Sequence, residues 1–280
     1  MFNSSSRAGN KKQHRGVGAE VAAYKRRVRL VSTVVTLVIV VCLLGVACYQ
    51  WVGPFIGANS NVDRSDDGNS GNAPRAVLVD ALYDASPNQL FTASLNRTLR
   101  DAGFEFCVFR GQEVTVDFLK RLEGGFRLVI LRVHSALSED GELFLFTGEP
   151  YSSDKYVEEQ SFRLVKKAYA TESSQPVFAV NWGFVKRLMA GKFNDSLVVA
   201  MGCESTCDSL MIHEVIVGQG AVGYVGWNGS VLLSHSDEAT SCFVEDLYVS
   251  KLPLREAIDK VNEKMGPDET EGATLECYVP

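Results

Sequence analysis

Two apolar runs that each end on a reactive side chain decide the expected fold: RLVILRVHSAL (residues 127–137) and SLVVAMGCEST (residues 196–206). Each run is rich in β-branched and aliphatic residues, which is typical of inner strands in a parallel sheet covered by helices on both faces. His134 follows the first run and Cys203 follows the second. In open parallel sheets the functional site lies beyond the carboxyl ends of the strands. We therefore expect His134 and Cys203 at the same edge of one sheet.

Strand-like and helix-like segments alternate on both sides of these two runs. Expected helices have apolar residues at helical spacing or a closing glycine such as Gly103. The expected strands are 76–82, 104–110, 127–133, 142–148, 196–202 and 221–227. The expected helices are 87–103, 115–125, 182–191, 207–220, 237–251 and 254–265. This alternation predicts an α/β fold, a three-layer sandwich with a mostly parallel central sheet.

The N-terminal part of the chain has the pattern of a membrane anchor. An uncharged apolar run covers residues 30–52, which is enough to span a hydrocarbon core of about 30 Å. Residues 1–29 carry eight Lys/Arg against one acid, so the positive-inside rule predicts a basic cytoplasmic tail and an extracytoplasmic remainder. A cleaved signal peptide is the alternative, although its apolar core usually has only about 7–15 residues. Residues 53–75, rich in Gly, Asn, Ser and Asp, predict a flexible linker before a domain at 76–280.

The composition of the expected domain argues against nucleic-acid binding. Residues 76–280 hold 18 Lys/Arg against 30 Asp/Glu, a net charge of −12, whereas a nucleic-acid footprint needs clustered basic residues. An acidic domain favours a cationic substrate, or the charge serves solubility alone. Five of the seven cysteines lie outside the apolar run: Cys107, Cys203, Cys207, Cys242 and Cys277. In an oxidising compartment an odd number leaves at least one free thiol.

The chemistry of Cys203 and His134 suits nucleophilic catalysis. A cysteine attacks as the thiolate, and a histidine near neutral pH can take its proton. We expect Cys203 to precede a helix whose N-terminal N–H groups stabilise negative charge. The backbone N–H groups of Cys203 and Ser135 are candidate donors of an oxyanion hole. Each residue taken alone is more often structural, and His235 is the alternative base, since His213 lies within an expected helix.

The order of these segments resembles the caspase-like cysteine peptidases, closest to the CHAT and gingipain-type domains. An apolar strand ending in His precedes, by about 70 residues, an apolar strand ending in Cys. The stretch GQGAVGYVGWNGSVLLSHSDEATSCFVEDLYVSKLPLREAIDKV (residues 218–261) is similar to the family's Gly-Ala strand, D-x-A-T helix start and Pro-Leu-x-x-Ala helix. The resemblance covers roughly residues 76–265.

The resemblance implies that Cys203 is the nucleophile and His134 its base. It also implies an oxyanion hole formed by the backbone of Cys203 and of Ser135, where the family usually has glycine. Gly202 stands where Ala or Ser is commoner before the nucleophile. A disulfide between Cys203 and Cys207 would silence the thiol.

Relatives that cut after Arg or Lys hold a carboxylate in the primary pocket, because a buried cation needs a charged partner. Asp80 is the best placed candidate, with Asp84, Glu204 and Asp237 as others, and Trp227 is a candidate apolar wall. The alternative is that Asp80 caps a turn and Trp227 fills the core.

The sequence thus predicts a single-pass cell-membrane protein whose extracytoplasmic domain cleaves protein or peptide substrates through a Cys/His dyad, without cofactor or metal. The alternative is an inactive caspase-like ectodomain that acts as a binding or scaffold module. No G-x-S-x-G elbow, P-loop or G-x-G-x-x-G turn occurs, which argues against other α/β enzymes. The oligomeric state is left open.

Overall fold

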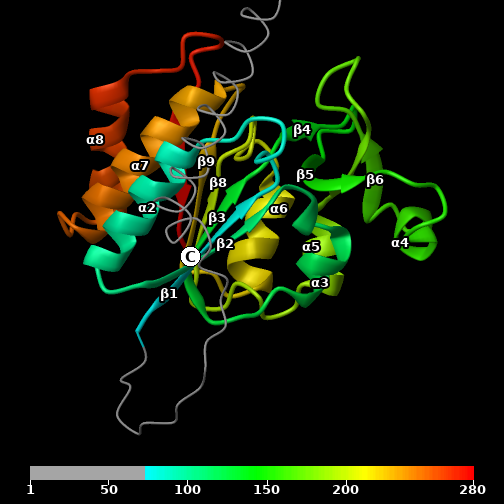
Figure 1. The fold of residues 1–280 in the computed structure, drawn as a ribbon, viewed down its shortest axis with the longest axis horizontal. Coiled ribbons are helices and arrows are strands. Elements are labelled where there is room, and N and C mark those ends of the chain that lie inside the picture. Colours follow the sequence, from blue (N-terminus) through cyan, green and yellow to red (C-terminus); the bar gives the residue numbers. More distant parts are fainter. Residues whose placement is uncertain (1–72) are drawn as a thin grey trace, which may run out of the picture. The chain divides into compact units, whose positions relative to one another are not determined.

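The computed structural model describes residues 73–280 and contains a six-stranded, mostly parallel central sheet (Figure 1). Its strand order is β10-β9-β8-β3-β1-β2, and only β10 runs antiparallel to its neighbour. The strands are β1 (Arg75–Asp80), β2 (Glu105–Arg110), β3 (Phe126–Arg132), β8 (Leu197–Ala200), β9 (Gly223–Trp227) and β10 (Leu275–Tyr278). The expected α/β fold with a mostly parallel central sheet is confirmed.

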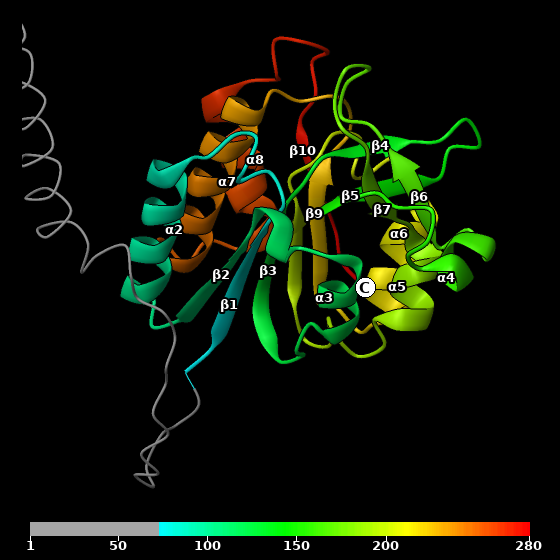
Figure 2. The same cartoon turned by 45° about the vertical axis from the view of Figure 1, so that its right-hand side comes forward.

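Helices lie on both faces of this sheet (Figure 2). One face carries α2 (Gln89–Asp101), α7 (Leu233–Tyr248) and α8 (Leu254–Met265). The other carries α3 (Val116–Arg121), α5 (Trp182–Leu188), α6 (Ser209–His213) and the π-helical turn η2 (Glu214–Gly218). Two separate apolar cores result, one on each side of the sheet. All four residues of β8 are therefore buried, as the apolar runs predicted.

Local sequence signals account for the helix ends. Asn88 caps α2 by accepting a hydrogen bond from the backbone N–H of Phe91 at 3.0 Å, and Gly103 follows the helix with φ of +85°. Thr115 caps α3 in the same way through Phe118. These caps fix the start of each helix within two residues of the expected position, whereas α3 ends four residues earlier than expected.

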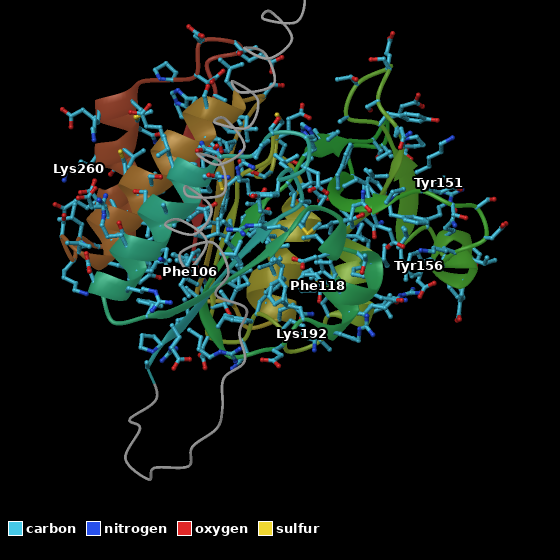
Figure 3. The ribbon with its side chains drawn as sticks, viewed as in Figure 1. Phe106, Phe118, Tyr151, Tyr156, Lys192 and Lys260 are labelled. Atoms are coloured by element: carbon cyan, nitrogen blue, oxygen red, sulfur yellow. The ribbon has the colours of Figure 1, made fainter. Side chains whose placement is uncertain are left out.

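A second, four-stranded antiparallel sheet departs from the expected simple alternation. Its order is β4-β5-β7-β6, with β4 (Ser135–Leu137), β5 (Leu143–Pro150), β7 (Val177–Val180) and β6 (Val165–Ala168), and a short helix α4 (Val157–Ser161) precedes β6. Only β5 was expected, as one strand of a hairpin. Tyr151 and Tyr156 lie at this end of the molecule, and each ring centroid is 5.0 Å from that of Phe178 (Figure 3). Phe178 also belongs to the apolar core on one face of the central sheet, so the second sheet packs on that core.

Two expectations for helices need correction or remain open. The helix expected at 207–220 begins two residues later, at Ser209, and changes to π-helical geometry at Glu214. The expected membrane segment 30–52 lies outside the described residues. Within residues 73–280, no helix is both long and apolar enough to cross a bilayer.

Candidate functional site

The structure places His134 and Cys203 after two neighbouring parallel strands. β3 pairs with β8 in a register that sets Leu131 opposite Ala200, and the N–H of Met201 donates to the Leu131 carbonyl at 2.9 Å. His134 and Cys203 each lie three residues beyond that last pair. The two residues therefore leave the sheet at the same edge, on adjacent strands.

Direct contact joins the two strand ends beyond the sheet. The hydroxyl of Ser135 donates to the carbonyl of Cys203 at 2.5 Å. A Cβ placed on Gly202 would lie 2.1 Å from the Ser135 hydroxyl oxygen and 2.8 Å from the Val133 carbonyl oxygen. The side chain of Ser135 thus fills the space that a side chain at position 202 would need. Serine after the histidine and glycine before the cysteine therefore fit each other sterically.

The ladder between β4 and β5 fixes the direction of the Ser135 N–H. The carbonyl of His134 accepts from the N–H of Phe146 at 2.8 Å, and the N–H of Ser138 donates to the Glu142 carbonyl at 2.9 Å. Because bonded and non-bonded pairs alternate in an antiparallel ladder, the N–H of Ser135 points away from β5.

Two backbone donors at this edge are free to bind a ligand. Neither the N–H of Ser135 nor that of Cys203 has a hydrogen-bond acceptor among residues 73–280. The N–H of Leu137, which faces the same way as that of Ser135, donates to a carboxylate oxygen of Glu204 at 3.4 Å. These are the two donors expected to form an oxyanion hole. The N–H groups of Val133, His134 and Gly202 likewise have no acceptor among residues 73–280, so the absence of an acceptor does not by itself single out the pair.

The thiol of Cys203 is half-buried and forms no disulfide. Its sulfur accepts from the backbone N–H of Val231 at 3.5 Å, and its S–H donates to the carbonyl oxygen of the same residue at 3.7 Å. Cys207, the partner considered for a disulfide, instead contacts the Asn228 carbonyl at 3.5 Å. The five cysteines of the described region are all free. The sulfur of Cys203 is thus not held in a disulfide here.

The environment of His134 favours a neutral imidazole. The residue reaches the surface, with part of its ring packed near Phe146, whose ring centroid is 6.2 Å away. Partial loss of water around the ring lowers the pKa of His134, and the nearby positive charge of Arg132 lowers it further. A neutral imidazole can accept a proton, so His134 suits the role of a base.

The alternative histidines are placed differently. His235 lies in the first turn of α7, with its Nδ1 atom 4.0 Å from a carboxylate oxygen of Asp268 and its ring against Trp227. Its Nε2 atom is buried and has no partner among residues 73–280. His213 is an exposed residue at the end of α6, and His14 lies outside the described residues. His134 follows β3, one of the two strands next to β8, by two residues, whereas His235 follows the other neighbour, β9, only after a loop and within α7.

The helix expected to support Cys203 does not begin there. Cys203 lies in a turn, and α6 begins at Ser209 after Asp208, whose carboxylate accepts the N–H groups of Leu210 and Met211. Because helix-dipole effects fall off within the first turn, α6 gives Cys203 no such stabilisation. Glu204, directly after Cys203, has a left-handed φ of +55°. The thiol is therefore positioned by turn geometry and by Val231.

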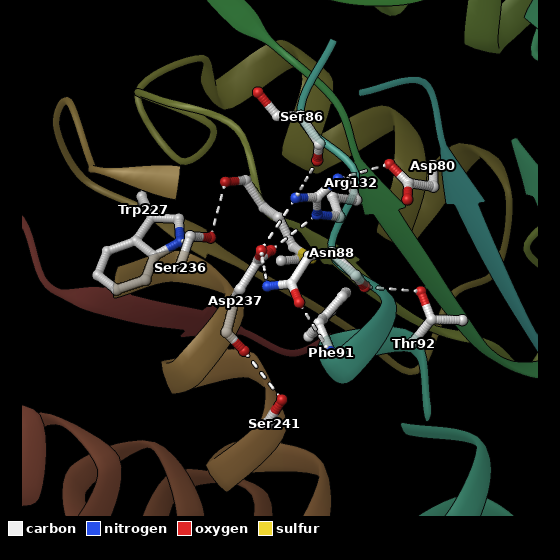
Figure 4. A network of polar contacts seen from close by, with 11 residues as sticks. Asp80, Ser86, Asn88, Phe91, Thr92, Arg132, Trp227, Ser236, Asp237 and Ser241 are labelled. Carbon is white, nitrogen blue, oxygen red and sulfur yellow. Dashed lines mark hydrogen bonds and ion pairs between the residues drawn. The ribbon is translucent and has the colours of Figure 1, made fainter. Parts of the chain in front are cut away.

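A buried ion-pair network occupies the region expected to be the primary pocket (Figure 4). Arg132, 1% exposed, donates to both carboxylate oxygens of Asp237 at 2.8 and 2.9 Å and to Asp80 at 2.8 Å. It also donates to the Ser86 carbonyl at 3.0 Å, and Asn88 donates to Asp237 at 2.9 Å. Both candidate pocket carboxylates are thus engaged by a cation from the chain itself.

The other pocket candidates also have structural roles. Trp227 is 1% exposed and belongs to a core cluster, and its indole N–H donates to Ser236 at 3.0 Å. Asp84 accepts the N–H of Gln112 at 3.1 Å. Asp80 does not act mainly as a turn cap, because its carboxylate pairs with Arg132 while its second oxygen is buried without a partner among the described residues. Burial raises the pKa of Asp80, although Arg132 opposes this shift.

Comparisons with known proteins do not identify a family for this chain. No protein-family model matches the chain, and no curated protein matches it significantly. Within residues 73–280, no group of three His, Cys, Asp or Glu side chains could hold a metal ion. What the structure offers is a thiol, an imidazole and two free N–H donors at one sheet edge.

Proposed function

We propose that residues 76–280 form a three-layer, caspase-like cysteine peptidase domain with Cys203 as nucleophile and His134 as base. The observation that carries this proposal is the shared edge of β3 and β8, where both residues follow paired positions of adjacent strands. The acceptor-free N–H groups of Ser135 and Cys203 support it, because acyl transfer needs donors for the developing oxyanion.

The proposed reaction has two steps. His134 takes the proton of the Cys203 thiol, and the sulfur attacks the scissile carbonyl carbon while the N–H groups of Ser135 and Cys203 bind the oxyanion. His134 then protonates the leaving amine, and the C–N bond breaks to leave a thioester. Water, deprotonated by His134, attacks the thioester and releases the acid and the thiol.

The substrate preference of the proposal differs from the one the resemblance implies. Asp80 and Asp237 are paired with Arg132, so neither is free to bind an arginine or lysine side chain of a substrate. We therefore do not assign them to a basic pocket. Glu204, half-buried directly after Cys203, remains a candidate carboxylate. Protein or peptide substrates are the proposed class, and the library described below determines the residue before the cleaved bond.

We also propose that residues 30–52 anchor the chain in the cell membrane, with residues 1–29 in the cytoplasm and residues 53–75 as linker. Support comes from the uncharged apolar run and the basic residues that precede it. The proposed substrates are then extracytoplasmic proteins near the membrane surface.

The proposed peptidase is tested by turnover of a fluorogenic peptide library that varies the residue before the cleaved bond. The full chain, purified in mild detergent, is compared with Cys203→Ala and with the matched control Cys207→Ala. We expect turnover in the wild type and in Cys207→Ala, and its loss in Cys203→Ala. Equal turnover by both variants, or none by the wild type, would end the assignment.

One observation favours an inactive binding module as the second candidate. Arg132 fills the space between two buried carboxylates, so a cationic group is already bound where a substrate side chain was expected. A module of this kind would cleave none of the library peptides.

A further inference from the structure

The sulfur of Cys203 receives its polar contacts from the backbone of one residue, Val231. This residue lies between β9 and α7. Its N–H donates to the sulfur at 3.5 Å, and the thiol donates to its carbonyl at 3.7 Å, a longer contact that is lost when the thiol is deprotonated. An N–H donor stabilises a thiolate more than a thiol, because hydrogen bonds to charged acceptors are the stronger ones. The position of Val231 therefore bears on the reactivity of Cys203.

Both neighbours of Val231 are anchored on the loop 268–271. The N–H of Leu232 donates to a carboxylate oxygen of Asp268 at 3.0 Å. The N–H of Ser230 donates to a carboxylate oxygen of Glu271 at 3.3 Å. The backbone on each side of Val231 is thus tied to a carboxylate of the same loop.

Asp268 is itself rigidly held. It is 1% exposed, and its other oxygen accepts the N–H of Thr270 at 2.9 Å. Its own N–H donates to the Ala273 carbonyl at 2.8 Å. Burial alone would raise the pKa of Asp268, but the N–H groups of Thr270 and Leu232, with His235 nearby, lower it overall. The side chain is therefore an ionised acceptor at neutral pH.

We propose that Asp268 is a positioning residue for the nucleophile: by holding the Leu232 N–H, it keeps the Val231 N–H directed at the sulfur of Cys203. The inference rests on the proposed role of Cys203. The direction of the change in Cys203 reactivity distinguishes this positioning role from a simple charge effect. A carboxylate charge disfavours a nearby thiolate, so its removal would speed reactions of the thiol, whereas loss of the positioned N–H would slow them.

The test is the alkylation of Cys203 by iodoacetamide on the full chain, followed by mass spectrometry across a range of pH. The variant is Asp268→Asn, in which one amide group cannot accept both N–H donors. The matched control is Glu269→Gln, which removes the same charge from the exposed neighbouring residue. Cys242 serves as the internal reference.

We expect Cys203 in Asp268→Asn to react about three- to ten-fold more slowly at pH 7, the effect of weakening one charge-assisted hydrogen bond. Glu269→Gln should react at the wild-type rate. An unchanged or faster reaction in Asp268→Asn would overturn the inference.

A milder variant covers the case in which Asp268→Asn does not fold. Glu271→Ala removes only the Ser230 contact, so we expect a smaller slowing in the same direction, with a thermal melt to confirm folding. A folded Glu271→Ala protein with faster alkylation would contradict the proposal. The readout needs no substrate, so it judges the positioning role even if the chain cleaves no peptide.

Discussion

Replacement of Arg132 by methionine should destabilise the folded chain severely. The guanidinium makes hydrogen bonds of 2.8 to 3.0 Å to Asp80, Asp237 and Ser86, and both carboxylates are almost fully buried. Methionine has a similar length but no charge, so two carboxylates would be left without a cation. Removing one partner of a buried ion pair costs about 3–5 kcal/mol. That loss is a large fraction of a typical stability of about 5–15 kcal/mol.

Thermal denaturation followed by tryptophan fluorescence measures this effect. For a domain of this size a loss of 1 kcal/mol lowers Tm by about 2–4 °C, so the expected drop is roughly 6–20 °C. Trp227 is a suitable reporter, because it is buried and its indole bonds Ser236, the residue before Asp237. The triple variant Arg132→Met, Asp80→Asn, Asp237→Asn removes the stranded charges and should regain more than half of the loss.

The pH dependence of the Arg132→Met defect has a definite sign. Burial already raises the pKa of Asp80, and without the Arg132 cation the rise is larger. A raised pKa in the folded state stabilises it at low pH and loses that contribution as pH rises through the folded-state value. The deficit should therefore be smaller at pH 5 than at pH 8. A deficit below about 1 kcal/mol, or one that grows on acidification, would refute the buried-network reasoning.

Three further predictions concern the sheet edge. His134→Ala should lower kcat about 10²- to 10⁴-fold. Because the pKa of His134 lies below its usual 6.5, wild-type kcat/KM should fall only below that pH. A decline that begins above pH 7 would contradict this prediction. Gly202→Ala should cost about 1–3 kcal/mol in urea denaturation, because its Cβ would overlap the Ser135 hydroxyl, and Ser135→Gly should restore part of it; additive losses would argue against that contact. Asp208→Ala should cost about 1–3 kcal/mol, since Asp208 caps α6 and accepts the Leu143 N–H, whereas Asp140→Ala, in an exposed turn, should be neutral.

The sequence signals that succeeded are local ones. Continuous apolar runs identified β3 and β8, and Gly103 marked the end of α2. A strand that is buried on both faces shows as a continuous apolar run, and a helix cap involves residues only a few positions apart. Both signals can therefore be recognised in a short stretch of sequence.

The features that the sequence analysis missed depend on distant partners. β7 and β6 are only four residues long and are defined by pairing with each other. Arg132 lies 52 residues from Asp80 and 105 from Asp237, so their network could not be read from spacing. The sequence nevertheless held a signal for this network: Arg132 lies in a strand that is expected to be buried on both faces, and a buried arginine requires carboxylate partners. That requirement removes Asp80 and Asp237 as free pocket residues.

The position of Cys203 was predicted better than its surroundings. Equal spacing from the paired residues Leu131 and Ala200 places His134 and Cys203 at one edge. The contact of Val231 with the sulfur arises from a loop 28 residues further along the chain, and the helix start was assigned too early. Apolar patterns identify buried strands, whereas strand order and loop contacts follow from the tertiary fold.

Trapping of the acyl-enzyme on Cys203 tests the central assignment most directly. A cleavable library peptide is mixed with the full chain, quenched in acid within milliseconds, and the acyl mass is located by peptide mapping. The assignment predicts a hydroxylamine-sensitive thioester on the fragment that contains Cys203, and none in Cys203→Ala. Turnover without any adduct at this sulfur, or an adduct on Cys207 instead, would contradict it.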